Sequence, residues 1–499
     1  MPIAFIPNDP RAGKPAGRKI KPHRDRKAGQ AGFTFDPLPA EKVYGERSRD
    51  FLLWQSREAA LRALETWEQL ASPVRGWMGK PSRKRLRLIA VAGDDLNAYY
   101  NRQSLSFFTA TVGGKPFYSG TSTDVVAHET GHALLDSIRP ELWDSMYFET
   151  GAFHEAFGDC VAILTALYDL QTRVALLARS RDLGRRNFVE TTAEDLSFAV
   201  RKNISPRHNA ATPRHARNRF NWVFNDSLPD DGPGSRLINE VHSFGQVFSG
   251  CFYDVIRGIY QHDGKKGERA LWAAAKKAGQ LLVRAAAKAP HVPRFMQAVG
   301  RCMALEQEDL FGGRYRDVVR QAFAGHKIAL GASSMLAPRA SIGAAPALRI
   351  GTQRASLARP AMNALMRHIR TPPKARFEMR TLDLGGRRIA EAKHMRLVDL
   401  TGTAKYLAGV RAPAAEPVLL ERSEGRAAIL GSTPNAAVTE DEVRKFVATL
   451  VRHGQISRRP AQSRGGPSVV VGAKPTHEVA KVDGARILRR VRYACGCNR

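Results

Sequence analysis

The stretch TSTDVVAHETGHALLDSIRP, residues 121–140, constrains the fold of this chain more than any other segment. A Ser or Thr at its start can cap a helix, Asp124 suits the first turn, and Pro140 cannot be accommodated in a helix interior. The stretch therefore predicts a helix over residues 124–138. Because His128 and His132 are four residues apart, this helix would hold both imidazoles on one face.

Two histidines at this spacing can bind one zinc ion, and Glu129 between them can reach a water on that ion. The spacing alone also fits a helix with two ordinary histidines, and a third ligand would separate the two interpretations. The segment ETGAFHEAFGDCVAILTALYDL, residues 149–170, predicts a second helix with an apolar face. Glu155 and Asp159 share a face of it, and both carboxylates are costly to bury without partners. Zinc for Glu155 and a histidine N–H for Asp159 would satisfy them.

Composition divides the 499 residues into four segments. Residues 1–42, rich in Pro, Gly, Lys and Arg, predict a disordered basic arm. Residues 43–330 predict the main domain, with a small mixed α/β lobe before a mainly helical lobe. Residues 331–372 predict an Ala-, Pro- and Arg-rich linker. Residues 373–499 predict a small basic α+β module with a capped helix in TEDEVRKFVATLVRHG and a hairpin in EVAKVDGARILRRV. The predicted fold class is α+β.

The net charge is +31, and residues 331–499 hold 30 Lys and Arg against 12 Asp and Glu. Such an excess favours weak, non-specific attraction of the basic tails to nucleic acid or to anionic surfaces. No zinc-finger spacing, aromatic-rich RNA-binding signature or basic recognition helix accompanies the charge. A dedicated nucleic-acid function is therefore the less favoured interpretation.

The sequence contains no apolar run long enough for a transmembrane segment and no visible signal peptide. Cytoplasmic residence is the default expectation, with unconventional export left open. The five cysteines are too few and too scattered to predict a disulfide framework. Cys495 and Cys497 could bind a metal or form a strained disulfide, but a mobile tail is the favoured interpretation.

Five motifs in one order resemble the thermolysin-like zinc metallopeptidases, or gluzincins, and indicate a divergent member of bacterial type. The motifs are NAYYN (97–101), DVVAHETGHALLD (124–136), ETGAFHEAFGD (149–159), AVRKNISP (199–206) and EVHSFGQVF (240–248). The resemblance covers about residues 45–328 and implies a two-lobed zincin domain with zinc on the floor of a cleft. It implies hydrolysis of peptide or protein substrates, with endopeptidase action expected first and exopeptidase action open.

The resemblance also implies roles for particular residues. The zinc ligands would be His128, His132 and Glu155, with Glu129 as general base, Asp159 as support of a zinc ligand, and His242 as the histidine that stabilises the oxyanion. Substrate contacts would come from Arg201, from Asn97 and Ala98 in an edge strand that pairs with extended peptides, and from Val125 and Val200 in an apolar pocket.

The sequence departs from the family pattern at several positions. Tyr147 lies one position from the expected oxyanion tyrosine, so its role is open. Leu237 replaces the Asp that usually orients the oxyanion histidine, and Glu240 either substitutes for it or faces solvent. Ala166 stands where a calcium-binding Glu would be, so no family-type double calcium site is expected. The alternative function is a catalytically weak or inactive zincin-fold protein that binds an anionic partner through its basic tails.

Overall fold

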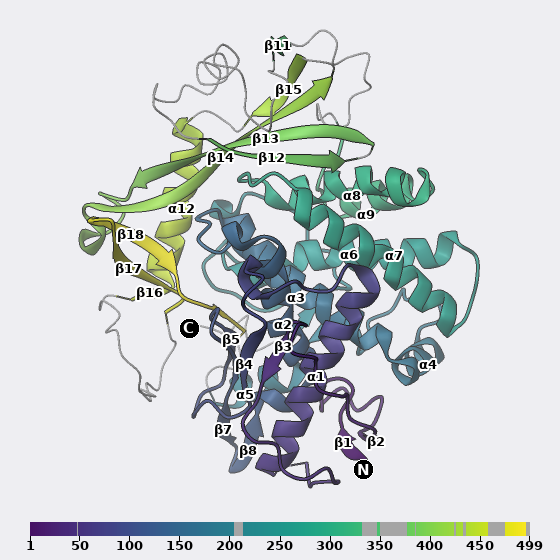
Figure 1. Ribbon diagram of the computed structural model, residues 1–499. Coiled ribbons are helices and arrows are strands. Elements are labelled where there is room, and N and C mark those ends of the chain that lie inside the picture. Colours follow the sequence, from purple (N-terminus) through teal and green to yellow (C-terminus); the bar gives the residue numbers. More distant parts are fainter. Residues whose placement is uncertain are drawn as a thin grey trace.

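The protein has an α+β fold, as the sequence predicts. A helical body carries a small sheet beside its N-terminal part, and a long, mostly antiparallel sheet lies across its other end (Figure 1). The computed structural model describes residues 1–46, 48–203, 213–331, 347–349, 377–384, 386–423, 426–432, 436–457 and 475–495. The predicted linker, residues 331–372, falls almost entirely outside the described residues.

Two helices form the centre of the body: α2 (Thr123–Ile138) and α3 (Phe148–Tyr168). Nearly every residue of both is buried, which agrees with their apolar composition. Around them lie α1 (Arg49–Leu70), α4 (Leu170–Arg179), α5 (Glu194–Asn203), α6 (Val241–His262), α7 (Glu268–Lys288), α8 (Phe295–Phe311) and α9 (Arg316–Gly325). The predicted helices over 124–138 and 149–170 are confirmed, except that Asp169 ends α3 and caps α4.

The small sheet has the strand order β19-β5-β6-β4-β3. Its strands are β3 (Gly32–Thr34), β4 (Arg85–Ile89), β5 (Ala98–Tyr100), β6 (Ser104–Phe107) and β19 (Tyr493–Ala494). β3, β4 and β6 are parallel, whereas β5 and β19 run antiparallel to their neighbours. The sheet therefore joins segments from both ends of the described chain.

Three short antiparallel strand pairs complete the described part of this region. They pair β1 (Ile3–Phe5) with β2 (Arg18–Ile20), β7 (Thr109–Val112) with β8 (Lys115–Tyr118), and β9 (Thr191–Thr192) with β10 (Arg214–His215). The last of them carries Arg214 into the body of the protein, where the side chain is buried.

The C-terminal module is a sheet with one long helix, α12 (Ala436–Arg452), packed against it (Figure 1). Its strands are β11 (Ala347–Arg349), β12 (Phe377–Leu384), β13 (Arg387–Asp399), β14 (Val410–Ser423), β15 (Arg426–Ser432), β16 (Ile456–Ser457), β17 (His477–Val482) and β18 (Ala485–Arg490). The predicted hairpin is confirmed, because β17 and β18 turn at Asp483 and Gly484, whose φ angles of 48° and 79° suit a two-residue turn.

The N-terminal arm differs from its prediction. Residues 1–42, expected to be disordered, are described throughout, and Ile3 and Phe5 are each only 1% exposed. The backbone of Ile6 exchanges hydrogen bonds with the side chain of Gln55 on α1. The few apolar residues of the arm are thus buried against a helix. Composition underestimates this ordering, because the partner surface is supplied by another segment.

Raising the pH is expected to weaken the attachment of this arm. The carboxylates of Glu58 and Glu65, at 2.7 and 2.8 Å, raise the pKa of His23 to about 9. A folded-state pKa above the unfolded value of 6.5 stabilises the protein below pH 6.5, and this contribution is lost as the pH rises through about 9. We expect the free energy of unfolding in urea to fall by about 1–3 kcal/mol between pH 6.5 and 9.5. His23→Ala should remove that difference, and an equal pH dependence in the variant would contradict the assignment.

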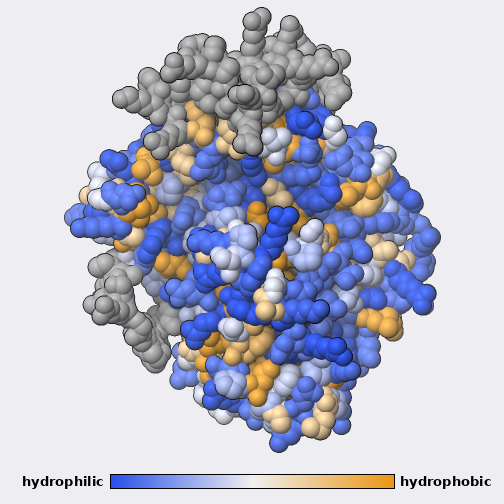
Figure 2. Space-filling view, viewed as in Figure 1, coloured by the Kyte–Doolittle hydropathy of each residue, from blue (hydrophilic) through white to orange (hydrophobic). Residues whose placement is uncertain are grey.

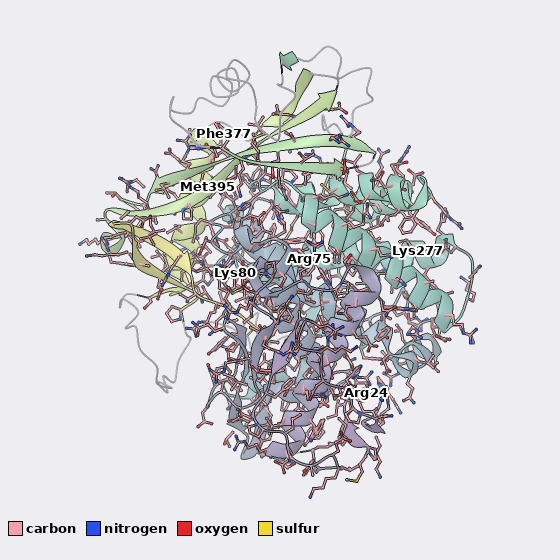
Figure 3. The ribbon with its side chains drawn as sticks, viewed as in Figure 1. Arg24, Arg75, Lys80, Lys277, Phe377 and Met395 are labelled. Atoms are coloured by element: carbon pink, nitrogen blue, oxygen red, sulfur yellow. The ribbon has the colours of Figure 1, made fainter. Side chains whose placement is uncertain are left out.

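Hydrophilic residues dominate the face in Figure 2, where hydrophobic residues occur in small separate areas. Of the basic side chains labelled in Figure 3, Arg24 lies in the N-terminal arm, whereas Arg75 and Lys80 both lie in the segment between α1 and β4. Among the described helices, none is by itself both long and apolar enough to span a membrane, and only α3 with α4, bent by 95°, meets the criteria as a pair.

Candidate metal centre

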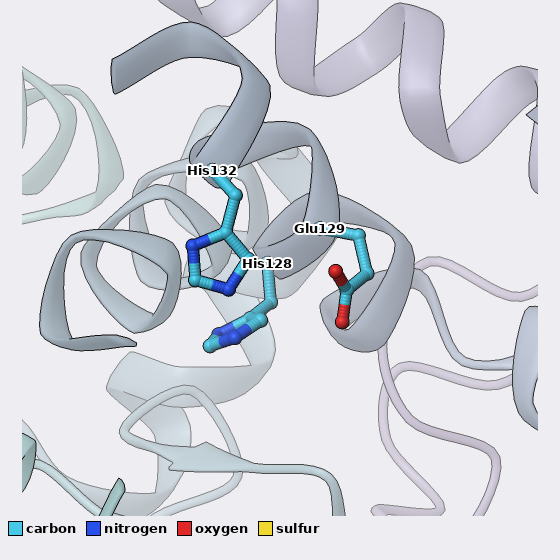
Figure 4. Close-up of side chains that lie close together, drawn as sticks. All are labelled: His128, Glu129 and His132. Carbon is cyan, nitrogen blue, oxygen red and sulfur yellow. The ribbon is translucent and has the colours of Figure 1, made fainter. Parts of the chain in front are cut away.

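The first side of the site is on α2. Ser122 caps this helix by accepting a hydrogen bond from the backbone N–H of Val125. His128 and His132 are fully buried, and their ring centroids lie 4.7 Å apart. The side chain of Glu129 projects from the same turn of α2, on a neighbouring side of the helix (Figure 4). The structure thus brings the two histidines to one face, as their spacing predicts.

The second side of the site is on α3, which crosses α2 at two glycines. A Cβ atom on Gly131 would lie 2.9 Å from the Cα of Gly158. A Cβ atom on Gly158 would lie 2.6 Å from Nδ1 of His128. Because neither glycine has a side chain, the two helices approach closely enough for α3 to present its carboxylates to the histidines of α2.

Three candidate ligand atoms converge between the helices. Oε2 of Glu155 lies 3.2 Å from Nε2 of His128 and 3.6 Å from Nε2 of His132. All three atoms are buried, and among the described residues none has a hydrogen-bond partner. Buried polar atoms without partners are costly, and three that face one another could hold a cation.

The spacing of these atoms fits zinc. Two ligand atoms at about 2.0–2.1 Å from a tetrahedral ion lie about 3.3 Å from each other. The distances from Glu155 to His128 and His132 are close to this value. A set of two imidazoles and one carboxylate is typical of catalytic zinc sites, in which the fourth position is open.

Asp159 and Arg214 support the first histidine. Oδ1 of Asp159 lies 2.9 Å from Nδ1 of His128 and accepts from Nη2 of Arg214 at 2.8 Å. Burial alone would raise the pKa of Asp159, but Arg214 and His128 lower it to about 2. The carboxylate is therefore ionised and holds the Nδ1–H of His128, which leaves Nε2 for a metal.

The second histidine has a partner that the sequence analysis missed. Nδ1 of His132 lies 3.1 Å from Nδ1 of His154, which precedes Glu155 on α3. Burial lowers the pKa of His132 to about 4, so its ring is neutral near pH 7. A neutral imidazole is the form that binds a metal.

Glu129 is placed to act as a base. It is fully buried, and among the described residues neither carboxylate oxygen has a hydrogen-bond partner. Burial raises the pKa of Glu129 to about 8. The charge of Glu155 adds to this rise, and the charge of His128 opposes it. One ligand atom of Glu129 is within 4.8 Å of those of His128 and His132. The carboxylate can therefore reach a molecule bound at the histidines.

His242 approaches the same cluster from the start of α6. Its Nε2 lies 3.1 Å from Oε2 of Glu155, and its Nδ1 lies 2.6 Å from Oε1 of Glu240. Glu240 is the N-cap of α6 and accepts from the backbone N–H groups of His242 and Ser243. Burial alone would raise the pKa of Glu240, but His242 and these donors lower it to about 2. Of the two roles left open by the sequence, the structure places Glu240 as the carboxylate that orients His242.

The predicted substrate residues divide into two groups. Asn97, Ala98, Val125 and Val200 are all buried, with Ala98 in β5, Val125 in the first turn of α2 and Val200 in α5. Arg201, in contrast, is exposed on the last turn of α5. The arginine that the structure brings to the ligand cluster is Arg214. It lies 55 positions after Asp159, and no local pattern marked it.

Tyr147 is occupied elsewhere. Its hydroxyl donates to the carbonyl oxygen of Ala415 on β14 at 2.6 Å, and the side chain is 1% exposed. The tyrosine thus joins the start of α3 to the C-terminal module. The aromatic ring that the structure places over the histidines is Tyr493, stacked on His132 with a centroid distance of 4.8 Å.

The C-terminal tail also differs from its prediction. Cys495, expected in a mobile tail, is 1% exposed and lies near Arg214, while Cys497 falls outside the described residues. A pocket beside His242 and Glu155 is lined by residues of α6 and α12 and of the segment that ends in β19. The C-terminal module therefore forms one wall of the candidate site.

A separate acidic cluster surrounds the start of α2. Ligand atoms of Asp9, Asp124 and Glu194 lie within 4.8 Å of one another. Burial raises the pKa of Asp124 to about 6, and burial with the charges of Asp124 and Asp9 raises that of Glu194 to about 10. The sequence had marked only Asp124 of this group. The raised pKa values mean that the three carboxylates share protons near neutral pH.

Gly158→Ala is expected to displace the ring of His128. The new Cβ would lie 2.6–2.9 Å from three ring atoms, which is closer than packing allows. We expect a loss of about 1–3 kcal/mol in unfolding free energy and a fall of about 10–100-fold in zinc affinity, as for lost support of a ligand. Competition with a chromogenic chelator measures the affinity. Gly325→Ala is the control, because a Cβ there would meet nothing within 4 Å. Unchanged zinc affinity in Gly158→Ala would contradict this account of the crossing.

No protein-family model matches the sequence, and no curated protein matches it significantly.

Proposed function

We propose that this protein is a zinc metallopeptidase with a two-lobed, thermolysin-like domain over residues 43–330. The observation that carries the proposal is the convergence of three buried ligand atoms without hydrogen-bond partners, on His128, His132 and Glu155. Glu129 and His242 flank these atoms, as a base and a hydrogen-bond donor should. Two ordinary core histidines would not leave a buried carboxylate oxygen and two ring nitrogens unpaired.

The chain supplies the groups that peptide hydrolysis requires. A zinc ion bound by the three ligands would lower the pKa of a water and polarise the substrate carbonyl. Glu129 takes a proton from the attacking water and later gives it to the leaving amine, and its carboxylate lies within reach of the two histidines. His242, held by Glu240, donates to the carbonyl oxygen as negative charge develops there.

The placement of His242 receives support from the chain itself. Its Nε2 lies 2.8 Å from the backbone carbonyl oxygen of Ala494, so this histidine donates to a peptide carbonyl at the edge of the cluster. Ala494 lies in a strand paired with β5, which is how an extended substrate would lie.

Metal analysis of the purified full-length chain tests the proposal. We expect about one zinc ion per chain, removed by a strong chelator and restored by added zinc. Cleavage of fluorescein-labelled casein is then followed in the full-length chain and in Tyr493→Ala, because Tyr493 covers His132 in the full-length chain. Absence of zinc after reconstitution would overturn the proposal. Zinc without cleavage in either chain would favour an inactive zincin-fold protein that binds an anionic partner through its basic tails.

A further inference from the structure

The strand β19 lies along the edge of the small sheet beside the candidate metal centre. It pairs antiparallel with β5, with Tyr493 opposite Tyr100 and Ala494 opposite Tyr99. The backbone N–H of Cys495 extends the pairing by donating to the carbonyl oxygen of Ala98 at 2.8 Å. A peptide that adds to a strand edge makes the same main-chain hydrogen bonds. The edge expected to receive a substrate is thus occupied by the chain's own C-terminal segment.

The side chain of Tyr493 covers the histidines. Its ring stacks on His154 with a centroid distance of 3.9 Å and an interplanar angle of 18°, and on His132 at 4.8 Å and 22°. The ring of Trp143 also packs edge-on against the ring of Tyr493, with a centroid distance of 5.4 Å. Tyr493 is 1% exposed, so the ring closes off the side of His132 that it contacts.

The backbone of β19 reaches the reactive side of the cluster. The carbonyl oxygen of Ala494 lies 2.8 Å from Nε2 of His242, and the same Nε2 lies 3.1 Å from Oε2 of Glu155. One residue further, Sγ of Cys495 lies 3.6 Å from both terminal nitrogens of Arg214. The strand therefore crosses the cluster from His242 to Arg214, along the path of a bound peptide.

The segment before β19 is anchored to the body. The indole N–H of Trp143 donates to the carbonyl oxygen of Arg490 at 3.0 Å, and the N–H of Arg490 donates to Asp144 at 3.1 Å. The N–H of Val491 donates to the carbonyl oxygen of Thr476 at 2.8 Å. These bonds hold the β17–β18 hairpin in place, so that β19 is a tethered ligand with a high effective concentration at the site.

We propose that residues 493–495 are an intramolecular inhibitor that occupies the peptide-binding edge of β5 and covers the metal centre. This inference rests on the proposed function. Because the pairing uses the backbone, the ligand that displaces β19 is an extended peptide segment, and an unfolded protein competes better than a compact one. The anchored hairpin remains docked while β19 leaves, so inhibition is reversible and needs no cleavage of the chain.

Peptide binding tests the inference without relying on turnover. Full-length chains carrying Glu129→Gln are titrated into fluorescein-labelled β-casein and followed by fluorescence anisotropy. Adding Tyr493→Ala removes the stacking on His132 and His154 and is expected to tighten binding at least tenfold. Tyr493→Phe is the matched control: it keeps the ring, and the buried hydroxyl has no hydrogen-bond partner among the described residues. Its affinity should equal that of Glu129→Gln alone. Equal affinity in all three chains, or no binding by the Tyr493→Ala chain, would overturn the inference.

A second variant and a second measurement guard against misfolding. Cys495→Pro removes the N–H that donates to Ala98 and should also tighten binding, with thermal unfolding recorded for every chain. In the Glu129→Gln chain without further change, saturating β-casein should speed hydrogen exchange at the amide of Cys495. Unchanged exchange at saturation would count against displacement even if both variants were unfolded.

Turnover separates this inference from the proposed function. If wild-type and Tyr493→Ala chains cleave casein at equal rates, the peptidase assignment stands and the inhibitor assignment is wrong. If Tyr493→Ala binds casein more tightly and contains zinc but cleaves nothing, the tail occupies a peptide site and the peptidase assignment is wrong.

Discussion

Replacing Glu129 with Gln in the Tyr493→Ala chain is expected to lower kcat for casein by about 10³-fold while zinc content stays unchanged. The amide has the same shape as the carboxylate but cannot accept a proton from water. Glu129 makes no hydrogen bond with the described residues, so the substitution breaks no network. Steady-state kinetics with metal analysis of the same samples measures both quantities.

A conservative change elsewhere provides the control for this experiment. Glu41→Gln alters a half-exposed carboxylate that pairs with the N-terminus, and it should leave kcat within a factor of two, or about 0.4 kcal/mol. A fall of less than tenfold in Glu129→Gln would show that another group takes the proton. A loss of zinc in Glu129→Gln would show that Glu129 is a ligand rather than the base.

Replacing His128 with Ala is expected to abolish zinc binding and turnover together. The variant loses one of three ligand atoms and leaves Asp159 without the imidazole that it holds at 2.9 Å. Breaking a buried pair of this kind costs about 3–5 kcal/mol, although Arg214 continues to pair with Asp159 and limits the loss. Metal analysis after dialysis measures zinc, and urea unfolding measures stability.

His262→Ala is the control for this variant, because His262 is exposed at the end of α6 and contacts Tyr315. It should keep about one zinc ion per chain. Full zinc occupancy in His128→Ala, with a folded chain by circular dichroism, would contradict the proposed ligand set. Glu155→Ala should reproduce the zinc loss through the other helix.

The amino-acid sequence alone predicted the two helices of the candidate site and which of their polar side chains share a face. The four-residue spacing of His128 and His132 and that of Glu155 and Asp159 place each pair on one helical face, whatever the helices pack against. The hairpin signal in the C-terminal module was equally local, and the turn at Asp483 and Gly484 follows from backbone preferences of two residues. The cap predicted at Thr439 was wrong, because α12 begins at Ala436 and Thr439 lies inside it.

Predictions that depended on a distant partner surface were less complete. Composition marked residues 1–42 as disordered, but Phe5 is buried against α1, and His23 pairs with Glu58 and Glu65 on that helix. Likewise, Cys495 is buried although it lies in a short, basic, glycine-containing tail. Neither segment buries enough apolar surface by itself, and both are ordered by contacts with helices and strands far away in the chain.

The sequence by itself determined the two helices and which of their His, Glu and Asp side chains share a face, because helical periodicity is local. Only the tertiary structure decided that Arg214 contacts Asp159, that Glu240 orients His242, and that β19 covers the site. Those contacts join residues far apart in the chain, or depend on side-chain direction at a helix start. Gly131 and Gly158 allow α2 and α3 to pack closely, which brings their side chains together. The periodicity of a sequence does not indicate which helices will pack in this way.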